Sequence, residues 1–164
     1  MDICLVSVRR FEILKRTVES FQAFVFPHFN IGNVYVNIDP FLGTSAEEEQ
    51  MIELLKTHFP QATIRRPDRP GFCKAVQWTW QQAQSPYILH MEDDWLAHEA
   101  ITSHNAEPLF ADDVINVAFM NASFAWNGHD RFSVRRRRHK FLGIPYGRSV
   151  ETRFGTSPGL WRTD

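Results

Sequence analysis

Short apolar segments alternate with amphipathic ones over the first 92 residues, and this alternation constrains the fold more than any other feature. The apolar segments are rich in β-branched residues, as buried strands are, and they lie at 3–8, 34–38, 62–65 and 87–91. Between them, apolar residues recur every three or four positions, which predicts helices over 11–25, 45–59 and 72–83. This order of elements predicts an α/β fold with a mainly parallel central sheet flanked by helices.

The alternation continues beyond Asp94 with a weaker helix pattern, and it loosens from Asn121 onward. It predicts a short helix near 99–106, a strand over 114–120 and a last short strand over 159–162. The basic segment 132–144 is predicted to be either a hairpin or a basic loop. A chain of 164 residues fits one domain, so we expect a single domain of minimal size over 1–164.

Composition places the chain among ordinary globular proteins. It is 43% hydrophobic and 23% charged, which excludes the disordered and low-complexity classes. No apolar run approaches the roughly 20 residues of a transmembrane helix, and the first residues lack the pattern of a secretory signal. Cys4 and Cys73 alone cannot build a disulfide framework or a four-ligand zinc site. The sequence therefore predicts a cytoplasmic protein without a transmembrane segment.

The net charge of −1 hides an asymmetry. Residues 1–125 hold 9 Lys and Arg against 16 Asp and Glu, whereas residues 126–164 hold 9 against 3. The densest basic run, Arg135–Lys140, is interpreted as a solvated loop or as a loop that closes over a pyrophosphate. A nucleic-acid binder that uses this run is a third alternative, but nucleic acid is not the expected partner because the rest of the chain is acidic.

Charged residues follow most of the predicted strands. The carboxyl ends of parallel strands share one edge of a sheet, and ligands of open α/β sheets bind there, so these residues are expected along one rim. They are Arg9, Arg10, Asp39, Arg65, Arg66 and Glu92–Asp94. Arg9 and Arg10 are interpreted either as a phosphate or base site or as solvated arginines. Asp39 is interpreted either as an acceptor for a base or ribose or as a turn former.

Three consecutive carboxylates, Glu92–Asp94, directly follow a predicted strand. Like charges this close repel one another, and a hard cation such as Mg²⁺ or Mn²⁺ would relieve that repulsion. Residues two apart in an extended chain point to one side, so Glu92 and Asp94 are expected to face the cleft while Asp93 points away or bonds locally. The alternative is an acidic turn at the start of the next helix. The sequence contains no G-x-G-x-x-G or Walker loop, which disfavours Rossmann dinucleotide and P-loop sites.

Three segments together resemble the nucleotide-sugar-binding half of GT-A fold glycosyltransferases. Ser7–Phe21 resembles the opening of family-2-like members, in which an apolar strand runs into a helix. Pro67–Gly71 with Ala75 resembles the N-x-G-x-x-x-A stretch, and Tyr87–Asp94 resembles the segment with the DxD motif. The Glu-Asp-Asp spelling is similar to that of the N-acetylglucosaminyltransferase I group. The resemblance covers residues 2–98 and implies a GT-A-like, Rossmann-like domain.

The resemblance also implies roles for individual residues. It makes 1–98 the donor-binding part and 99–164 a shortened acceptor-side part that includes the basic loop 132–144. Asp94 would bind Mn²⁺ or Mg²⁺, with Glu92 or His129 as further candidate ligands. The expected nucleotide-sugar contacts are Ser7, Val8, Arg9, Arg10, Asp39, Arg66, Arg69, Lys74, Glu92 and Asp93.

The implied activity is metal-dependent transfer of a hexose or N-acetylhexosamine from a UDP-sugar to an acceptor. The acceptor could be a glycan, a lipid, a protein or a small molecule. Inverting members of the fold also use a carboxylate base to deprotonate the acceptor hydroxyl, for which Asp130 and Asp164 are the candidates here. The chain departs from the pattern at Val76-Gln77, where many members carry Arg-Asn. Two alternatives stay open: a nucleotide-sugar-binding domain without transfer activity, and a sugar-phosphate nucleotidyltransferase.

Overall fold

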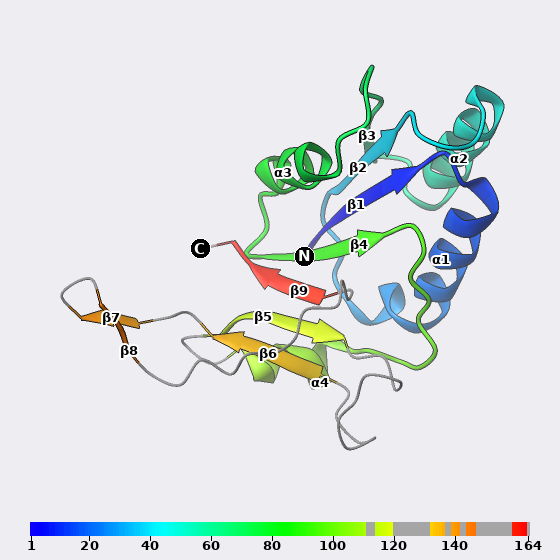
Figure 1. The fold of residues 1–164 in the computed structure, drawn as a ribbon. Coiled ribbons are helices and arrows are strands. Elements are labelled where there is room, and N and C mark those ends of the chain that lie inside the picture. Colours follow the sequence, from blue (N-terminus) through cyan, green and yellow to red (C-terminus); the bar gives the residue numbers. More distant parts are fainter. Residues whose placement is uncertain (111–113, 120–131, 137–138, 142–143, 147–158, 164) are drawn as a thin grey trace.

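The structure is a computed structural model that describes residues 1–110, 114–119, 132–136, 139–141, 144–146 and 159–163 (Figure 1). Its strands are β1 (Asp2–Val8), β2 (Val34–Asp39), β3 (Thr63–Arg65), β4 (Tyr87–Glu92), β5 (Val114–Phe119), β6 (Phe132–Arg136), β7 (His139–Phe141), β8 (Ile144–Tyr146) and β9 (Gly159–Arg162). Its helices are α1 (Phe11–Phe24), α2 (Ser45–His58), α3 (Phe72–Gln82) and α4 (Ser103–Ala106), with short 3₁₀ turns at Phe26–His28 and Glu107–Leu109.

Seven strands form one sheet in the order β3-β2-β1-β4-β9-β5-β6. The pairs β1–β2, β1–β4 and β2–β3 are parallel, whereas β9 runs antiparallel to both of its neighbours and β6 runs antiparallel to β5. Strands β1 to β5 therefore share one direction, and β9 and β6 oppose it. The predicted α/β fold with a mainly parallel sheet is confirmed.

The two faces of the sheet carry different cores, because successive side chains of a strand point to opposite faces. On one face, Leu5 and Val36 pack with residues of α1 and α2 such as Leu14 and Met51. On the other face, Cys4 packs in a second cluster with tryptophans of α3, and α3 lies against β1 and β2. Figure 1 shows α1 and α2 together on one side and α3 apart from them.

The start of α2 is set by a capping box. The Thr44 side chain accepts a hydrogen bond from the Glu47 backbone N–H, and the Glu47 carboxylate accepts one from the Thr44 N–H. The sequence permits a second register with Ser45 and Glu48, but the structure uses the first. Glu48 is therefore not needed as a cap and is free to bind elsewhere.

The helix predicted near 99–106 is wrong in its first half. Helix α4 begins at Ser103 because the Thr102 side chain caps it by accepting from the Asn105 N–H. The Ile101 N–H donates instead to the carbonyl of Phe24 at the end of α1. The chain from Asp94 to Thr102 is thus held against α1 outside any helix.

The last predicted strand is confirmed, because β9 pairs with β4 on one side and β5 on the other. The basic segment 132–144 contains β6, which joins the main sheet, and β7, which forms a hairpin with β8. In the part of the chain that the structure describes, no helix has both the length and the apolar character needed to cross a bilayer.

Candidate functional site

Asp93 is the most heavily bonded residue at the carboxyl edge of the sheet. Its buried carboxylate accepts hydrogen bonds from Ser7 Oγ at 2.8 Å and from the Val8 backbone N–H at 3.0 Å. Arg10 adds an ion pair to the Oδ1 atom and a contact from Nε to Oδ2 at 3.4 Å. The carboxylate therefore holds the loop between β1 and α1 in place.

The turn that carries Asp93 is also held by hydrogen bonds from helix α1. Thr17 Oγ1 donates to the backbone carbonyl of Asp93 at 2.6 Å, and Ser20 Oγ accepts from the Ala97 N–H at 3.1 Å. Both hydroxyl groups belong to a helix that packs beneath the edge of the sheet. The position of the acidic turn is therefore determined by residues distant in sequence.

Asp39, at the end of β2, connects two further segments. Its Oδ1 atom accepts from Asn37 Nδ2 at 2.7 Å, and its Oδ2 atom accepts from the Gly71 N–H at 2.8 Å. The first bond comes from its own strand and the second from the loop that leads into α3. Each carboxylate oxygen still has capacity for another donor, because a carboxylate has about four acceptor positions.

These residues surround a cleft of about 360 Å³, a size typical of a small-ligand site. Six of the ten predicted nucleotide-sugar contacts line it: Ser7, Val8, Arg10, Asp39, Glu92 and Asp93. The other lining residues are Val6, Phe41, Pro70, Gly71, Phe72 and Ala75. The two phenylalanines were not predicted to line the site. Phe41 lies in a loop, where no periodic pattern marks a residue, and Phe72 was assigned to the apolar positions of the helix predicted over 72–83.

Glu92 is half-buried in the wall of the cleft beside two other carboxylates. Its burial, together with the charges of Asp94 and Asp93, raises its pKa to about 7, and Arg10 offsets only part of this. Among the described residues that line the cleft, the three carboxyl groups of Asp39, Glu92 and Asp93 therefore outnumber the one arginine, Arg10.

The arrangement of the triplet differs from the expected one. Glu92 and Asp93 line the cleft, whereas the side chain of Asp94 is 47% exposed and is not among the lining residues. Strand β4 ends at Glu92, so Asp93 lies in a turn and the two-residue alternation no longer applies. No helix starts directly behind the triplet, since the next described helix begins at Ser103.

A divalent cation fits the donors of this edge only in part. Within the described ranges, no group of three or more His, Cys, Asp or Glu side chains is arranged to hold a metal. Asp93 is engaged by three residues, which leaves Glu92 and Asp94 as oxygen donors close enough to repel each other. Mg²⁺ and Mn²⁺ take one or two carboxylates and complete their coordination with water and phosphate oxygens, so two donors suit a metal that arrives with a diphosphate.

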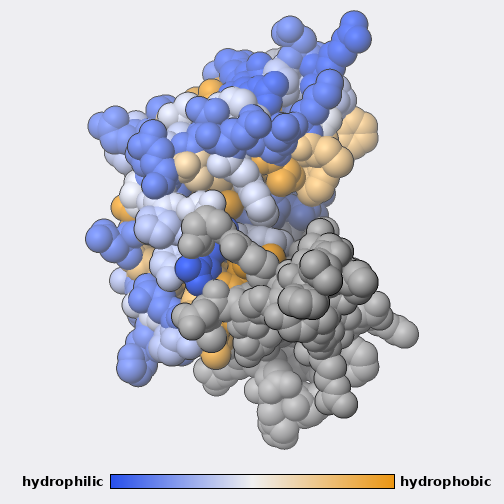
Figure 2. All heavy atoms as spheres, turned by 90° about the vertical axis from the view of Figure 1, so that its left-hand side faces the viewer, coloured by the Kyte–Doolittle hydropathy of each residue, from blue (hydrophilic) through white to orange (hydrophobic). Residues whose placement is uncertain are grey.

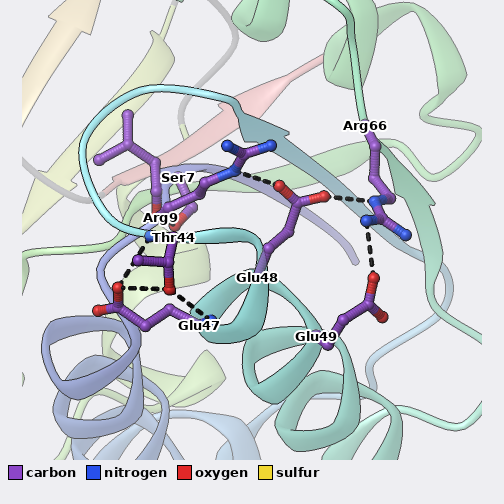
Figure 3. Close-up of polar contacts among 8 residues, drawn as sticks. Ser7, Arg9, Thr44, Glu47, Glu48, Glu49 and Arg66 are labelled. Carbon is purple, nitrogen blue, oxygen red and sulfur yellow. Dashed lines mark hydrogen bonds and ion pairs between the residues drawn. The ribbon is translucent and has the colours of Figure 1, made fainter.

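Arg9 and Arg66 lie beside the cleft and bind the buried carboxylate of Glu48 from two sides (Figure 3). Burial alone would raise the pKa of Glu48, but the hydrogen bonds from the two arginines hold it below its usual value. Arg66 also contacts Glu49 at 2.7 Å. The predicted rim thus divides into a cleft and a neighbouring ion-pair cluster that connects the ends of β1 and β3 to α2.

The other predicted residues take less central positions. Arg65 lies over the ring of Trp78, with 5.5 Å between the guanidinium carbon and the ring centroid. Arg69 and Lys74 are exposed and are not among the residues that line the cleft. His129, Asp130 and Asp164 lie outside the described residues.

No family model and no curated protein matches this sequence. Solved structures of glycosyltransferases share its fold. The mannosyltransferase PcManGT from Pyrobaculum calidifontis, in complex with GDP-Man and Mn²⁺, matches with a TM-score of 0.59 and 14% identity over 77% of this chain and 37% of its own. TarS (1–349) from S. aureus matches with a TM-score of 0.60 and 12% identity over 99% of this chain and 47% of its own.

The same TarS protein in complex with UDP matches with a TM-score of 0.59 and 14% identity, over 99% of this chain and 46% of its own. The chain thus spans less than half the length of each of these proteins. At these identities the likeness shows a common GT-A-like fold, which agrees with the fold that the sequence resemblance implies.

Proposed function

We propose that this chain is the nucleotide-sugar-binding core of a metal-dependent glycosyltransferase that transfers a hexose or N-acetylhexosamine from a UDP-sugar. One observation carries the proposal: side chains from the carboxyl ends of β1, β2 and β4 converge on one cleft of about 360 Å³. In open α/β sheets this edge is where ligands bind. The shared fold with glycosyltransferases supports the proposal.

In this proposal, Asp39 receives the base and Asp93 receives the ribose. Among the described residues, the Oδ2 atom of Asp93 accepts from Ser7, Val8 and Arg10, whereas its Oδ1 atom accepts from Arg10 alone. Oδ1 therefore has the remaining capacity for a hydroxyl donor such as a ribose 2′- or 3′-OH. Arg10 balances the carboxylates around the bound nucleotide.

The diphosphate would lie toward the basic residues at the rim. Arg9, Arg66, Arg69 and Lys74 stay candidates for phosphate contacts. Arg9 and Arg66 bind Glu48 through Nε, and Arg66 also binds Glu49 through Nη2. Among the contacts of the described residues, this leaves both terminal nitrogens of Arg9 and Nη1 of Arg66 for an anion. Asp94 would hold Mn²⁺ or Mg²⁺, with Glu92 or His129 as the second protein ligand. When bound, the metal neutralises charge on the departing diphosphate.

Transfer forms a bond between an acceptor oxygen and C1 of the sugar as the bond from C1 to the β-phosphate oxygen breaks. The acceptor proton must pass to a base, and Asp130 and Asp164 stay the candidates. The acceptor is a glycan, a lipid, a protein or a small molecule.

A second candidate function is nucleotide-sugar binding without transfer. It is compatible with the same cleft at the ends of β1, β2 and β4, which accounts for the binding of a nucleotide and does not itself require transfer. A sugar-phosphate nucleotidyltransferase is the third candidate. It would use a nucleoside triphosphate and release pyrophosphate.

Thermal unfolding with a panel of nucleotides tests all three functions. A ligand present at 100 times its Kd stabilises a protein by about 2.7 kcal/mol, which is measurable. We expect UDP-sugars to raise the melting temperature in the presence of Mn²⁺ and to raise it less without it. Release of UDP from the donor by the purified chain separates transfer from binding alone, and pyrophosphate release from UTP with a sugar phosphate identifies a nucleotidyltransferase. A panel in which no nucleotide or nucleotide sugar shifts the melting temperature contradicts the proposal.

A further inference from the structure

Two large aromatic side chains in the cleft are exposed to solvent. Phe41 is 53% exposed and Phe72 is 51% exposed, and both line the cleft. The other exposed large hydrophobic residues of the described part, Ile13, Phe24, Leu42 and Leu96, are not among the lining residues. The described part of the face drawn in Figure 2 is mainly hydrophilic, with scattered hydrophobic side chains. Phe41 and Phe72 differ from the other exposed hydrophobic residues in that both line the same cleft.

The backbone of Phe41 is fixed by hydrogen bonds although its ring is exposed to solvent. Its N–H donates to the Asp39 carbonyl at 2.8 Å, and its carbonyl accepts from the Arg9 N–H at 3.1 Å. The next two residues, Leu42 and Gly43, have positive φ angles of 57° and 41°. A left-handed conformation at leucine costs roughly 1–2 kcal/mol, so the loop keeps a strained shape that presents Phe41.

Phe72 is positioned by the same residue that holds Phe41. Phe72 is the first residue of α3, and the N–H of the preceding Gly71 donates to Asp39 Oδ2 at 2.8 Å. Asp39 thus anchors Phe41 through its backbone carbonyl and the loop of Phe72 through its carboxylate. The two rings and the remaining acceptor capacity of this carboxylate occur together in one cleft.

We propose that Phe41 and Phe72 form an aromatic clamp that stacks on the base of the donor nucleotide while Asp39 accepts an N–H from the edge of that base. This inference rests on the proposed function and adds the residues that give the base its affinity. Stacking on aromatic side chains tolerates any base, because every base has a π-face. Selection among bases then belongs to Asp39, which favours uracil N3–H or guanine N1–H.

A planar heterocycle matches these groups better than a purely apolar ligand does. Asp39 is already buried and accepts from Asn37 and Gly71, and an apolar ligand between the rings would exclude water from its remaining acceptor positions without supplying a donor, which is unfavourable. A base offers two apolar faces to the rings and an N–H donor to the carboxylate. The clamp therefore accounts for both the exposed rings and the remaining acceptor capacity.

Calorimetric titration of the full chain with UDP in Mn²⁺ tests the clamp. We expect Phe41→Leu and Phe72→Leu each to weaken UDP binding about tenfold, as is usual for the loss of a base-stacking ring. The matched control is Leu42→Ala, which removes an equally exposed side chain of the same loop outside the cleft, and its affinity should stay within about twofold of the wild type. Inorganic pyrophosphate, which lacks a base, should bind all variants equally.

The same titrations with GDP, CDP and ADP separate stacking from edge recognition. The clamp variants should lower the affinity for every nucleotide by a similar factor, whereas Asp39→Asn should change the order of preference. Unchanged UDP affinity in both clamp variants, with a wild type that binds UDP, overturns the clamp and leaves the proposed function standing. A wild type that binds none of the four nucleotides overturns the proposed function together with the clamp.

Discussion

Ser7 donates a hydrogen bond of 2.8 Å to the buried carboxylate of Asp93, a residue 86 positions away in the sequence. The bond joins the end of β1 to the turn after β4, and the parallel pairing of these two neighbouring strands brings the two residues together. The contact shows that the pairing of β1 with β4 brings residues distant in the sequence together at the edge of one cleft. It also makes Ser7 a sensitive point for the stability of that cleft.

Replacement of Ser7 by alanine should lower the free energy of unfolding by about 1 kcal/mol, because a buried carboxylate loses one donor. Urea denaturation followed by circular dichroism measures the change. Ser45→Ala is the matched control, since Ser45 is exposed and is not the residue that caps α2. An equal loss in both variants would contradict the role given to the Ser7–Asp93 bond.

Asp2 lies at the opposite end of β1 from the cleft, and its lowered pKa should make the stability of the protein depend on pH. Burial alone would raise its pKa, but hydrogen bonds from Ser85, Gln84 and Asn33 together hold it below the ordinary value of 3.8. The stabilisation is therefore complete at neutral pH and is lost as the pH falls below about 4 toward the lowered pKa.

Asp2→Asn should cost about 1–3 kcal/mol at pH 7, because an amide N–H₂ would face groups that donate. The difference from the wild type should shrink at pH 3, where the native carboxyl group begins to take up a proton. Urea unfolding of both proteins at the two pH values measures this. A difference that stays constant with pH would contradict the lowered pKa of Asp2.

Glu48 should contribute more to stability than its neighbour Glu49, although both are ion-paired. Glu48 is buried and binds Arg9 and Arg66, whereas the side chain of Glu49 is 62% exposed. We expect Glu48→Gln to cost about 1–3 kcal/mol and Glu49→Gln less than about 0.5 kcal/mol. Unfolding curves of the two variants give the comparison, and similar values would show that the Glu48 cluster is no stronger than a surface pair.

Asp94 is expected to affect metal-dependent binding without affecting the fold. Its carboxylate is exposed, and its ion pair within the described part of the chain is a contact of 3.3 Å with Arg10, so Asp94→Ala should leave the melting temperature almost unchanged. The same variant should remove most of the gain in UDP-sugar affinity that Mn²⁺ provides. Calorimetry with and without Mn²⁺ measures this gain, with the exposed Asp68→Asn as the control. A gain equal to that of the wild type would exclude Asp94 as the metal ligand.

The sequence predicts the sheet well because buried parallel strands need uninterrupted apolar runs. Segments such as 3–8 and 34–38 are apolar on both faces, and the structure places them in β1 and β2. The carboxyl-edge rule then places Asp39 and the acidic triplet Glu92–Asp94 along one rim before any contact is known. What failed is the alternation assumed for the acidic triplet, because a turn replaces the strand after Glu92.

Contacts between side chains of different helices and strands could not be predicted from the sequence. Glu48 has the spacing of a capping-box residue, and its actual partners Arg9 and Arg66 lie 39 and 18 positions away. The sequence allows two capping pairs, Thr44 with Glu47 and Ser45 with Glu48. The structure uses the first pair, because Glu48 forms ion pairs with Arg9 and Arg66 instead. The exposed ring of Phe41 was also missed, since the signal for it is a strained loop rather than a periodic pattern.

Gly43 is the position where the loop tolerates least change. It has a φ angle of 41°, and a Cβ atom there would come within 1.8 Å of the Arg9 carbonyl oxygen. Gly43→Ala must therefore displace the loop from Arg9, and we expect a loss of about 2 kcal/mol or more, as for other side chains forced into strained backbone. Gly71→Ala is the control, because a Cβ atom at Gly71 would meet only Lys74 side-chain atoms, at an ordinary 3.7 Å. Urea unfolding of the two variants should separate them clearly, and equal stability would contradict the close approach of the two loops.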